Sequence, residues 1–173
     1  HPRGGKRTLE IKDYSRPPDV FDISLKIQSG EIFGIGGMVG AGRTEFVRLL
    51  FGLDGRTSGT LLLDGKDITP NNPLEAIRNG ICLITEDRQK TGLILVRPIK
   101  ENITIAKLNI EQNIFINLKE EEKAAITMIE KLKITTQGIY QEVKELSGGN
   151  QQKVVLAKWL LTEADIYIFD EPT

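Results

Sequence analysis

The sequence predicts an α/β fold in which a strand-rich core is interrupted by a helical insertion and then resumes. Three observations predict it. Runs typical of strands occur before residue 92 and again after residue 165, a glycine-rich loop joins one apolar run to a helix, and strand signals disappear between residues 92 and 146. Charged residues make up 27% of the 173 residues and the net charge is −1, which disfavours both disorder and general nucleic-acid binding.

The first third of the chain predicts strands around a glycine-rich loop. Strict alternation over residues 21–27 predicts a half-buried strand, and looser alternation over 8–14 predicts another. Residues 32–36 predict a short apolar strand that runs into the loop. The helix expected over 43–51 ends at Gly52, a residue suited to the left-handed position after a helix.

The next elements continue the core. A strand is expected over 60–63 and turns at Asp64-Gly65, and Pro73 opens a short helix that Gly80 closes. A buried strand is expected over 81–85. It contains the only cysteine, Cys82, which we interpret as a core residue of a protein from a reducing compartment.

The second half predicts a mainly helical lobe and then a return to the core. Residues 119–132 have the apolar spacing of an amphipathic helix, and Ser147 is a helix-capping residue for a helix that runs to about 161. The last strand, 166–169, is apolar on both faces, as in the middle of a parallel sheet. We therefore expect a fragment that lacks its C-terminal part. Residues 1–7 are polar, without the apolar stretch of a signal peptide, and are interpreted as a linker or terminal extension.

The glycine-rich loop predicts phosphate binding. Gly37, Gly40 and Gly42 let backbone N–H groups converge on an anion, and the start of the following helix adds a partial positive charge. Thr44 lies where a P-loop holds Mg²⁺, whereas Arg43 replaces the usual lysine. The alternative is an ordinary tight turn between a strand and a helix. A dinucleotide-binding fingerprint is excluded, because Gly34 and Gly36 are not followed by a glycine at position 39.

Two later segments add to this chemistry. The string Leu146–Lys153 (LSGGNQQK) places a hydroxyl and paired glycines at a helix start, which is receptive to anions. Asp170 and Glu171 follow the last apolar strand, where one acid holds Mg²⁺ through water and the next polarises an attacking water. Taken alone, each segment also suits a capped helix or a surface corner.

The order and spacing of the three segments resemble the nucleotide-binding domain of ABC transporters across residues 8–173. Ser147 follows Gly37 by 110 residues, and Asp170 follows Ser147 by 23. The resemblance implies a P-loop NTPase fold with an antiparallel β subdomain, a core formed by 8–91 and 146–173, and a helical subdomain over 92–145. The glycine loop corresponds to the Walker A motif, 146–153 to the signature motif and 166–171 to Walker B.

Residues 40–45, 85–88 and 146–153 look like the second half of a monosaccharide-importer ATPase of the ribose, galactose or xylose type. This resemblance implies ATP and Mg²⁺ as cofactors, and a place at the cytoplasmic face of the inner membrane. It also implies three partners: an upstream ABC domain of the same polypeptide, a membrane permease and, through the permease, a sugar-binding protein. An isolated fragment would be inactive, because one ABC site takes Walker A and the signature motif from different domains.

The resemblance also assigns roles to residues. Tyr14 is the candidate for stacking on adenine, with Phe21 as its rival, Arg43 faces the β- and γ-phosphates, and Glu171 is the general base. Mg²⁺ would be held by Thr44, Glu86 and Asp170. The expected nucleotide contacts are Tyr14, Gly37, Met38, Val39, Gly40, Ala41, Gly42, Arg43, Thr44, Glu45, Ser147, Gly148, Gly149, Asn150 and Gln151, of which the signature residues 147–149 would reach the partner domain's nucleotide.

Three departures from the family pattern predict weak hydrolysis. Arg43 carries a bulkier cation than lysine, Glu45 places a carboxylate where a hydroxyl is usual, and Glu86 replaces the glutamine that senses the γ-phosphate. The alternative is a regulatory half that never hydrolyses ATP and donates its signature motif to a competent partner; Glu171 argues against complete inactivity.

A DNA-repair or chromosome ATPase is excluded, because 110 residues between motifs leave no room for a long coiled coil. Leu93, Ile94 and Leu95 are the apolar candidates for docking on the permease.

Overall fold

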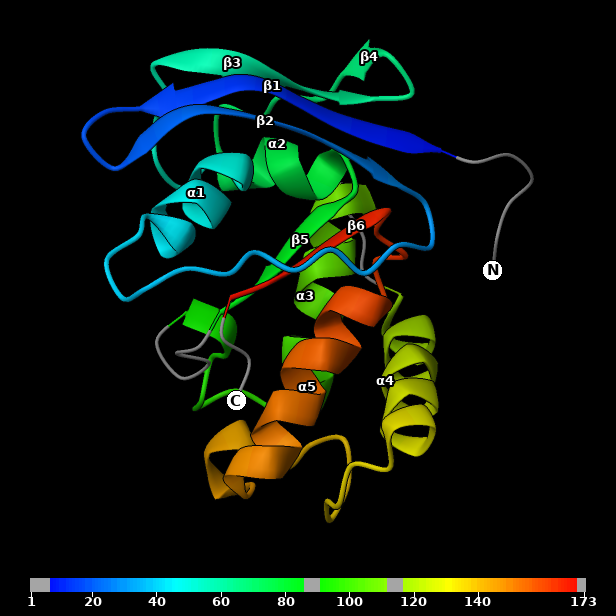
Figure 1. The fold of residues 1–173 in the computed structure, drawn as a ribbon. Coiled ribbons are helices and arrows are strands. Elements are labelled where there is room, and N and C mark those ends of the chain that lie inside the picture. The colour runs from blue at the N-terminus through cyan, green and yellow to red at the C-terminus, as the bar shows by residue number, and fades with distance from the viewer. Residues whose placement is uncertain (1–6, 86–90, 112–116, 171–173) are drawn as a thin grey trace. The chain divides into compact units, whose positions relative to one another are not determined.

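The computed structural model describes residues 7–85, 91–111 and 117–170, and the chain divides into two compact units, His1–Asn79 and Gly80–Thr173 (Figure 1). The first unit carries the glycine loop, and the second carries the helical segment, the LSGGNQQK string and the last strand. These two units are defined by contacts within the chain. The expected division into a core (8–91 and 146–173) and a helical subdomain (92–145) is a different one and stays a prediction.

The first unit is an antiparallel sheet with two helices on one face, as Figure 1 shows. Its four strands lie in the order β2-β1-β3-β4, so that the first strand of the chain is internal. The helix bounds agree with the sequence signals, because Asn72 caps α2 through a hydrogen bond from the Glu75 amide and Gly52 follows α1 with a φ of +71°. The elements are β1 (Thr8–Arg16), β2 (Val20–Gln28), α1 (Arg43–Leu50), β3 (Ser58–Leu63), β4 (Lys66–Asp67) and α2 (Pro73–Arg78).

An irregularity in β1 decides which side chains enter the core of this unit. The register with both neighbours shifts between Ile11 and Ser15, and Asp13 adopts a φ of +50°. A bulge of this kind changes which face the following side chains occupy. As a result both Ile11 and Tyr14 are buried, three positions apart, and Tyr14 packs edge-on against Phe46 of α1 at a centroid distance of 6.5 Å.

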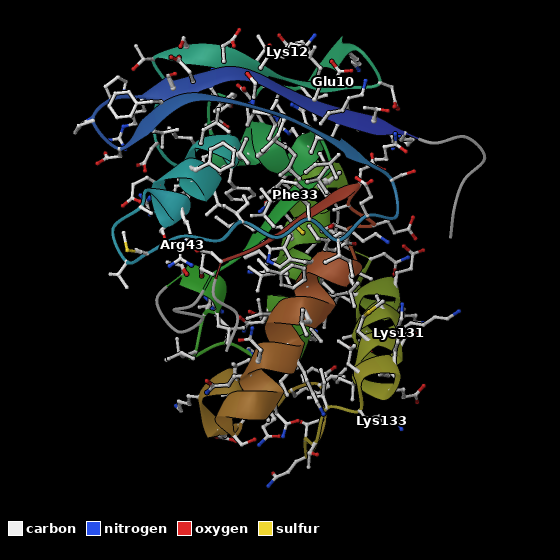
Figure 2. The ribbon with its side chains drawn as sticks, in the orientation of Figure 1. Glu10, Lys12, Phe33, Arg43, Lys131 and Lys133 are labelled. Carbon is white, nitrogen blue, oxygen red and sulfur yellow. The ribbon has the colours of Figure 1, made fainter. Side chains whose placement is uncertain are left out.

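The strand expected over 32–36 is not formed. Residues 31–40 are exposed and have no regular secondary structure, and the Ile32 side chain is fully accessible. A strand is stabilised by hydrogen bonds to a neighbouring strand and not by its own apolar pattern. None of the described strands pairs with this segment, so its apolar side chains, including Phe33 in Figure 2, stay uncovered.

The second unit joins a short parallel sheet to packed helices. β5 and β6 pair in parallel, with Ile81 opposite Ile166 and Ile84 opposite Phe169. The helical lobe is confirmed, because α3 and α4 occupy the region where strand signals disappear. Across the described ranges, no helix is both long and apolar enough to cross a membrane. The elements are β5 (Ile81–Ile84), α3 (Ile99–Glu111), α4 (Leu118–Leu132), the 3-10 helix η2 (Val143–Glu145), α5 (Gly148–Leu160) and β6 (Ile166–Phe169).

Candidate functional site

The glycine loop is an exposed connection that ends directly at the start of α1. Residues 37–41 are exposed, and the Ala41 amide donates to the Met38 carbonyl at 3.1 Å to form a turn. Gly40 and Gly42 have φ values of +82° and +76°, a conformation that side chains rarely adopt. The positions of these two glycines are therefore required by the backbone path of the loop.

Gly42 has a second constraint, which comes from a neighbouring turn. A Cβ atom on Gly42 would lie 2.3 Å from the carbonyl oxygen of Asp19, in the turn between β1 and β2. Only a residue without a side chain permits this close approach. The contact holds the β1–β2 turn against the end of the glycine loop.

The first turn of α1 carries three polar side chains directly after the glycine loop. Thr44 is exposed, and Arg43 and Glu45 are half-buried; Figure 2 shows Arg43 at the start of the helix. Gly42 is the N-cap and offers no side chain to the helix amides. The amide dipoles of a helix start attract anions. They also attract an acid in the first turn, which gives Glu45 a structural reason to be there.

The prediction that Tyr14 stacks on adenine is wrong, because its side chain has 0% exposure and its ring packs on Phe46. The β1 bulge at Asp13 turns this side chain inward. Phe21, the rival, is 63% exposed and lies two residues after Asp19, whose carbonyl contacts the glycine loop. Phe21 is thus open to a ligand, as is Phe33 (51% exposed), which precedes the glycine loop in the chain.

The LSGGNQQK string forms the start of α5, as expected, but Ser147 does not cap the helix with its side chain. Ser147, Gly148 and Gly149 are exposed. The hydroxyl of Ser147 instead accepts a hydrogen bond from the Asn150 side-chain amide at 3.1 Å. The Ser147 hydroxyl and the two glycines that begin α5 are therefore accessible from solvent.

Gln151 does not belong to this exposed group. It is 4% exposed, and its side-chain amide donates to the Val143 carbonyl at 3.2 Å. The predicted nucleotide contact by Gln151 is therefore wrong, because the side chain holds η2 against α5.

Of the three acidic residues expected to hold Mg²⁺ or to act as the general base, only Asp170 lies within the described residues. Asp170 follows β6, is half-buried, and its amide donates to the Ile84 carbonyl at 2.8 Å, which extends the pairing with β5. Glu86 and Glu171 lie outside the described residues. Thr44 and Asp170 belong to different units. Within the described ranges no three His, Cys, Asp or Glu side chains cluster as a metal site.

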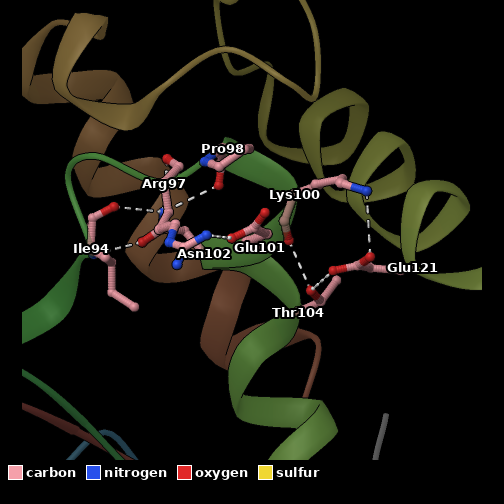
Figure 3. A network of polar contacts seen from close by, with 8 residues as sticks. All are labelled: Ile94, Arg97, Pro98, Lys100, Glu101, Asn102, Thr104 and Glu121. Atoms are coloured by element: carbon pink, nitrogen blue, oxygen red, sulfur yellow. Dashed lines mark hydrogen bonds and ion pairs between the residues drawn. The ribbon is translucent and has the colours of Figure 1, made fainter. Parts of the chain in front are cut away.

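Of the three candidate docking residues in the loop before α3, only Ile94 is exposed. Leu93 is buried and Leu95 half-buried, whereas Ile94 is 46% and Val96 65% exposed. The buried Asn102 fixes this loop, as Figure 3 shows: its Oδ1 accepts from the Ile94 amide at 2.8 Å, and its Nδ2 donates to the Ile94 carbonyl at 3.0 Å. The buried Asn102 side chain thus holds the loop while two apolar side chains, Ile94 and Val96, stay exposed.

Comparison with known proteins gives a family and a set of relatives. The family model described as ABC transporter matches residues 20–173. The ribose import ATP-binding protein RbsA of Oceanobacillus iheyensis is 44% identical over 173 residues, which cover 99% of this chain and 35% of the relative. The protein of the same name from Clostridium perfringens is 45% identical, with 98% and 34% covered. The chain thus spans about a third of the length of these relatives.

Solved structures agree on the fold. A nucleotide-free ATP-binding cassette from an ABC transporter superposes with a TM-score of 0.77 at 21% identity, covering 96% of this chain and 70% of that one. A dimeric cassette in a post-hydrolysis state bound to ADP and Pi gives a TM-score of 0.76 at 20% identity, with 95% and 74% covered. The P-loop NTPase fold of the ABC cassettes is therefore the fold of this chain.

Proposed function

Because the chain belongs to the ABC transporter family, we propose that it is the ATP-binding and ATP-hydrolysing domain of a monosaccharide importer. The observation that carries the proposal is the exposed glycine loop at the start of α1, in a chain that is 44% identical to a ribose import ATP-binding protein. The geometry of the loop fits phosphate, since Gly40 and Gly42 adopt left-handed conformations directly before a helix start, where backbone amides attract anions.

Nucleotide binding would begin with this loop. The loop 37–44 would surround the phosphates, the Arg43 guanidinium would face the β- and γ-phosphates, and Phe21 would offer a ring to adenine. Thr44, Glu86 and Asp170 would hold Mg²⁺, which neutralises phosphate charge when bound. Glu171 would take a proton from the attacking water.

Hydrolysis at this loop is proposed to be weak. Phosphoryl transfer depends on position and on neutralisation of charge, and Glu45 brings a carboxylate to the first turn of the helix that would receive the phosphates. Two unit charges about 5 Å apart repel by roughly 3 kcal/mol at an effective dielectric constant near 20. Glu86 in place of an amide adds to the same effect. A regulatory half that binds ATP without hydrolysing it is the second candidate, and it is favoured by the same residues.

The signature residues are proposed to serve a second nucleotide. Ser147, Gly148 and Gly149 would contact the γ-phosphate of a nucleotide held by a partner ABC domain, which we propose lies upstream in the same polypeptide. In this arrangement the domain works at the cytoplasmic face of the membrane with a permease and its sugar-binding protein. Ile94, whose backbone is held by Asn102, and Val96 are the proposed contacts to the permease.

The test is sugar-stimulated ATP hydrolysis by the importer reconstituted with its permease and binding protein. We expect ribose or galactose to stimulate both hydrolysis and uptake. Glu171→Gln is then compared with the equivalent substitution in the partner ABC domain, and the partner's variant should lose more activity. Hydrolysis that no monosaccharide stimulates would contradict sugar import, and equal losses would contradict weak hydrolysis at this loop.

A further inference from the structure

The side-chain amide of Asn150 joins two backbone regions at the start of α5. Its Oδ1 accepts a hydrogen bond from the Thr135 amide at 3.0 Å, and its Nδ2 donates to the Ser147 hydroxyl oxygen at 3.1 Å. A backbone N–H can only donate, so the Thr135 amide determines which end of the Asn150 side chain is the oxygen. The NH₂ group must therefore face Ser147.

This orientation decides what the Ser147 hydroxyl can do. A hydroxyl carries one proton and two lone pairs, and here one lone pair accepts from Asn150. The proton is then directed to another partner. In the part of the chain that the structure describes, no acceptor takes it, and the hydroxyl does not cap α5. Ser147 is exposed, so the O–H group is ready to donate to an anion from outside.

We propose that Asn150 is a positioning residue, which turns the Ser147 hydroxyl into a hydrogen-bond donor for the γ-phosphate, and not a nucleotide ligand itself. The inference rests on the proposed function, in which Ser147 contacts the nucleotide of a partner domain. It assigns Asn150 a role different from the direct contact expected from sequence, since both ends of its amide are used within the chain.

The same contact links Ser147 to the end of α4. Thr135 lies just after Lys133, the C-cap of α4, and the Lys133 carbonyl accepts from the Lys153 ammonium at 2.7 Å. Asn150 and Lys153 therefore tie the same turn to α5, but only Asn150 also touches Ser147. Lys153 itself belongs to the signature string, so the matched control is Thr136, whose hydroxyl donates to Gln141 Oε1 at 2.6 Å in the same turn.

The test compares Asn150→Asp with Asn150→Ala in the assembled importer. Aspartate keeps the bond from the Thr135 amide but cannot donate to Ser147, and it accepts the serine proton instead. Alanine loses both contacts and leaves the hydroxyl free to rotate. We expect Asn150→Asp to keep the higher thermal midpoint but to lower kcat by about tenfold or more, as for one lost hydrogen bond to a charged group, while Asn150→Ala lowers it less. If Asn150 had only a structural role, the less stable of the two variants would also have the lower kcat. That result would overturn the proposal.

A double-mutant cycle separates positioning from direct repulsion of the nucleotide by the new carboxylate. In a Ser147→Ala background, Asn150→Asp should cause no further loss of kcat, because its effect passes through the hydroxyl. A further tenfold loss would show direct repulsion and overturn the inference. Thr136→Val, which loosens the same turn outside the signature string, should leave kcat close to the wild-type value. A loss equal to that of Asn150→Asp would also overturn the proposal. If Ser147→Ala itself leaves kcat unchanged, then the proposed contact of Ser147 with the partner domain's nucleotide is wrong, whatever the role of Asn150.

Discussion

Lys100 of α3 and Glu121 of α4 form an ion pair that is almost completely buried. The Nζ–Oε2 distance is 3.5 Å, and the side chains are 11% and 7% exposed. Figure 3 shows how Thr104 completes the pair, because its hydroxyl donates to Glu121 Oε1 at 2.8 Å. The Lys100 ammonium also lies 4.9 Å from the centre of the Tyr140 ring. The pair fixes α4 on α3 within the helical lobe.

Removing one partner of this pair should destabilise the helical lobe strongly. Lys100→Met leaves the Glu121 carboxylate buried beside Thr104 alone, and we expect a loss of about 3–5 kcal/mol in the free energy of unfolding. The double variant Lys100→Met/Glu121→Leu removes both charges and should recover most of that loss. Urea denaturation followed by far-UV circular dichroism measures both. A double variant as unstable as Lys100→Met would contradict this account.

Lys158 should make stability rise with pH. Burial lowers the pKa of this lysine to about 8, and its ammonium donates to the Gly92 carbonyl at 2.7 Å and lies 4.8 Å from the centre of the Trp159 ring. An unfolded lysine titrates near about 10.4. Between these values the unfolded state binds more protons than the folded state, so the free energy of unfolding rises with pH, by roughly 3 kcal/mol in all.

This effect needs a background without Cys82. Burial raises the pKa of the Cys82 thiol to about 12, so above the pKa of an unfolded cysteine this group lowers stability as pH rises. We therefore compare Cys82→Ala with Cys82→Ala/Lys158→Met by urea denaturation from pH 7 to 10.5. The first protein should gain stability relative to the second above pH 8. Parallel pH profiles would contradict a buried ammonium at Lys158.

Gly42→Ala should distort the glycine loop for two reasons, the strained backbone conformation and a clash of the new Cβ with Asp19. The new Cβ would lie 2.3 Å from the Asp19 carbonyl oxygen, at a φ of +76°. Gly30→Ala is the matched control, because Gly30 has a φ of +86° and nothing within 4 Å of its would-be Cβ. A left-handed conformation costs a non-glycine residue about 1–2 kcal/mol at either site. We expect Gly42→Ala alone to lower ATP affinity by at least about tenfold, about 1.4 kcal/mol, in titration calorimetry. Equal affinities for the two variants would show that the Asp19 contact does not shape the loop.

Local signals predicted most elements of this fold. Asn72 before Pro73, Gly52 after α1 and the Asp64-Gly65 turn all act through the backbone of a few neighbouring residues, and the structure has each as expected. The helical lobe followed from periodicity in the same way. These features depend on short-range sterics and hydrogen bonds, which are visible in the sequence itself.

The features that sequence did not predict depend on distant partners. Alternation along β1 does not show the bulge at Asp13, which buries Tyr14 and removes it from the candidate site. The apolar pattern of 32–36 does not supply a partner strand. The contact of Asp19 with Gly42 and that of Thr135 with Asn150 join residues 15 or more positions apart, so neither leaves a local signal.

We expect the loop that ends at Arg43 to bind the phosphates of ATP. Arg43→Ala removes a cation at the start of α1 and should weaken ATP binding by about 1.5–3 kcal/mol, the value of a hydrogen bond to a charged group. Arg43→Lys keeps the charge, and a compact ammonium fits a P-loop, so affinity should be retained. Arg97→Ala, which removes an exposed arginine in the other unit, serves as the control.

The direct measurement is calorimetric titration of Mg-ATP into the protein and these three variants at one ionic strength. We expect wild-type affinity for Arg43→Lys and Arg97→Ala, and a loss of tenfold to about a hundredfold for Arg43→Ala. Unchanged ATP affinity in Arg43→Ala would contradict the phosphate-binding role of the loop.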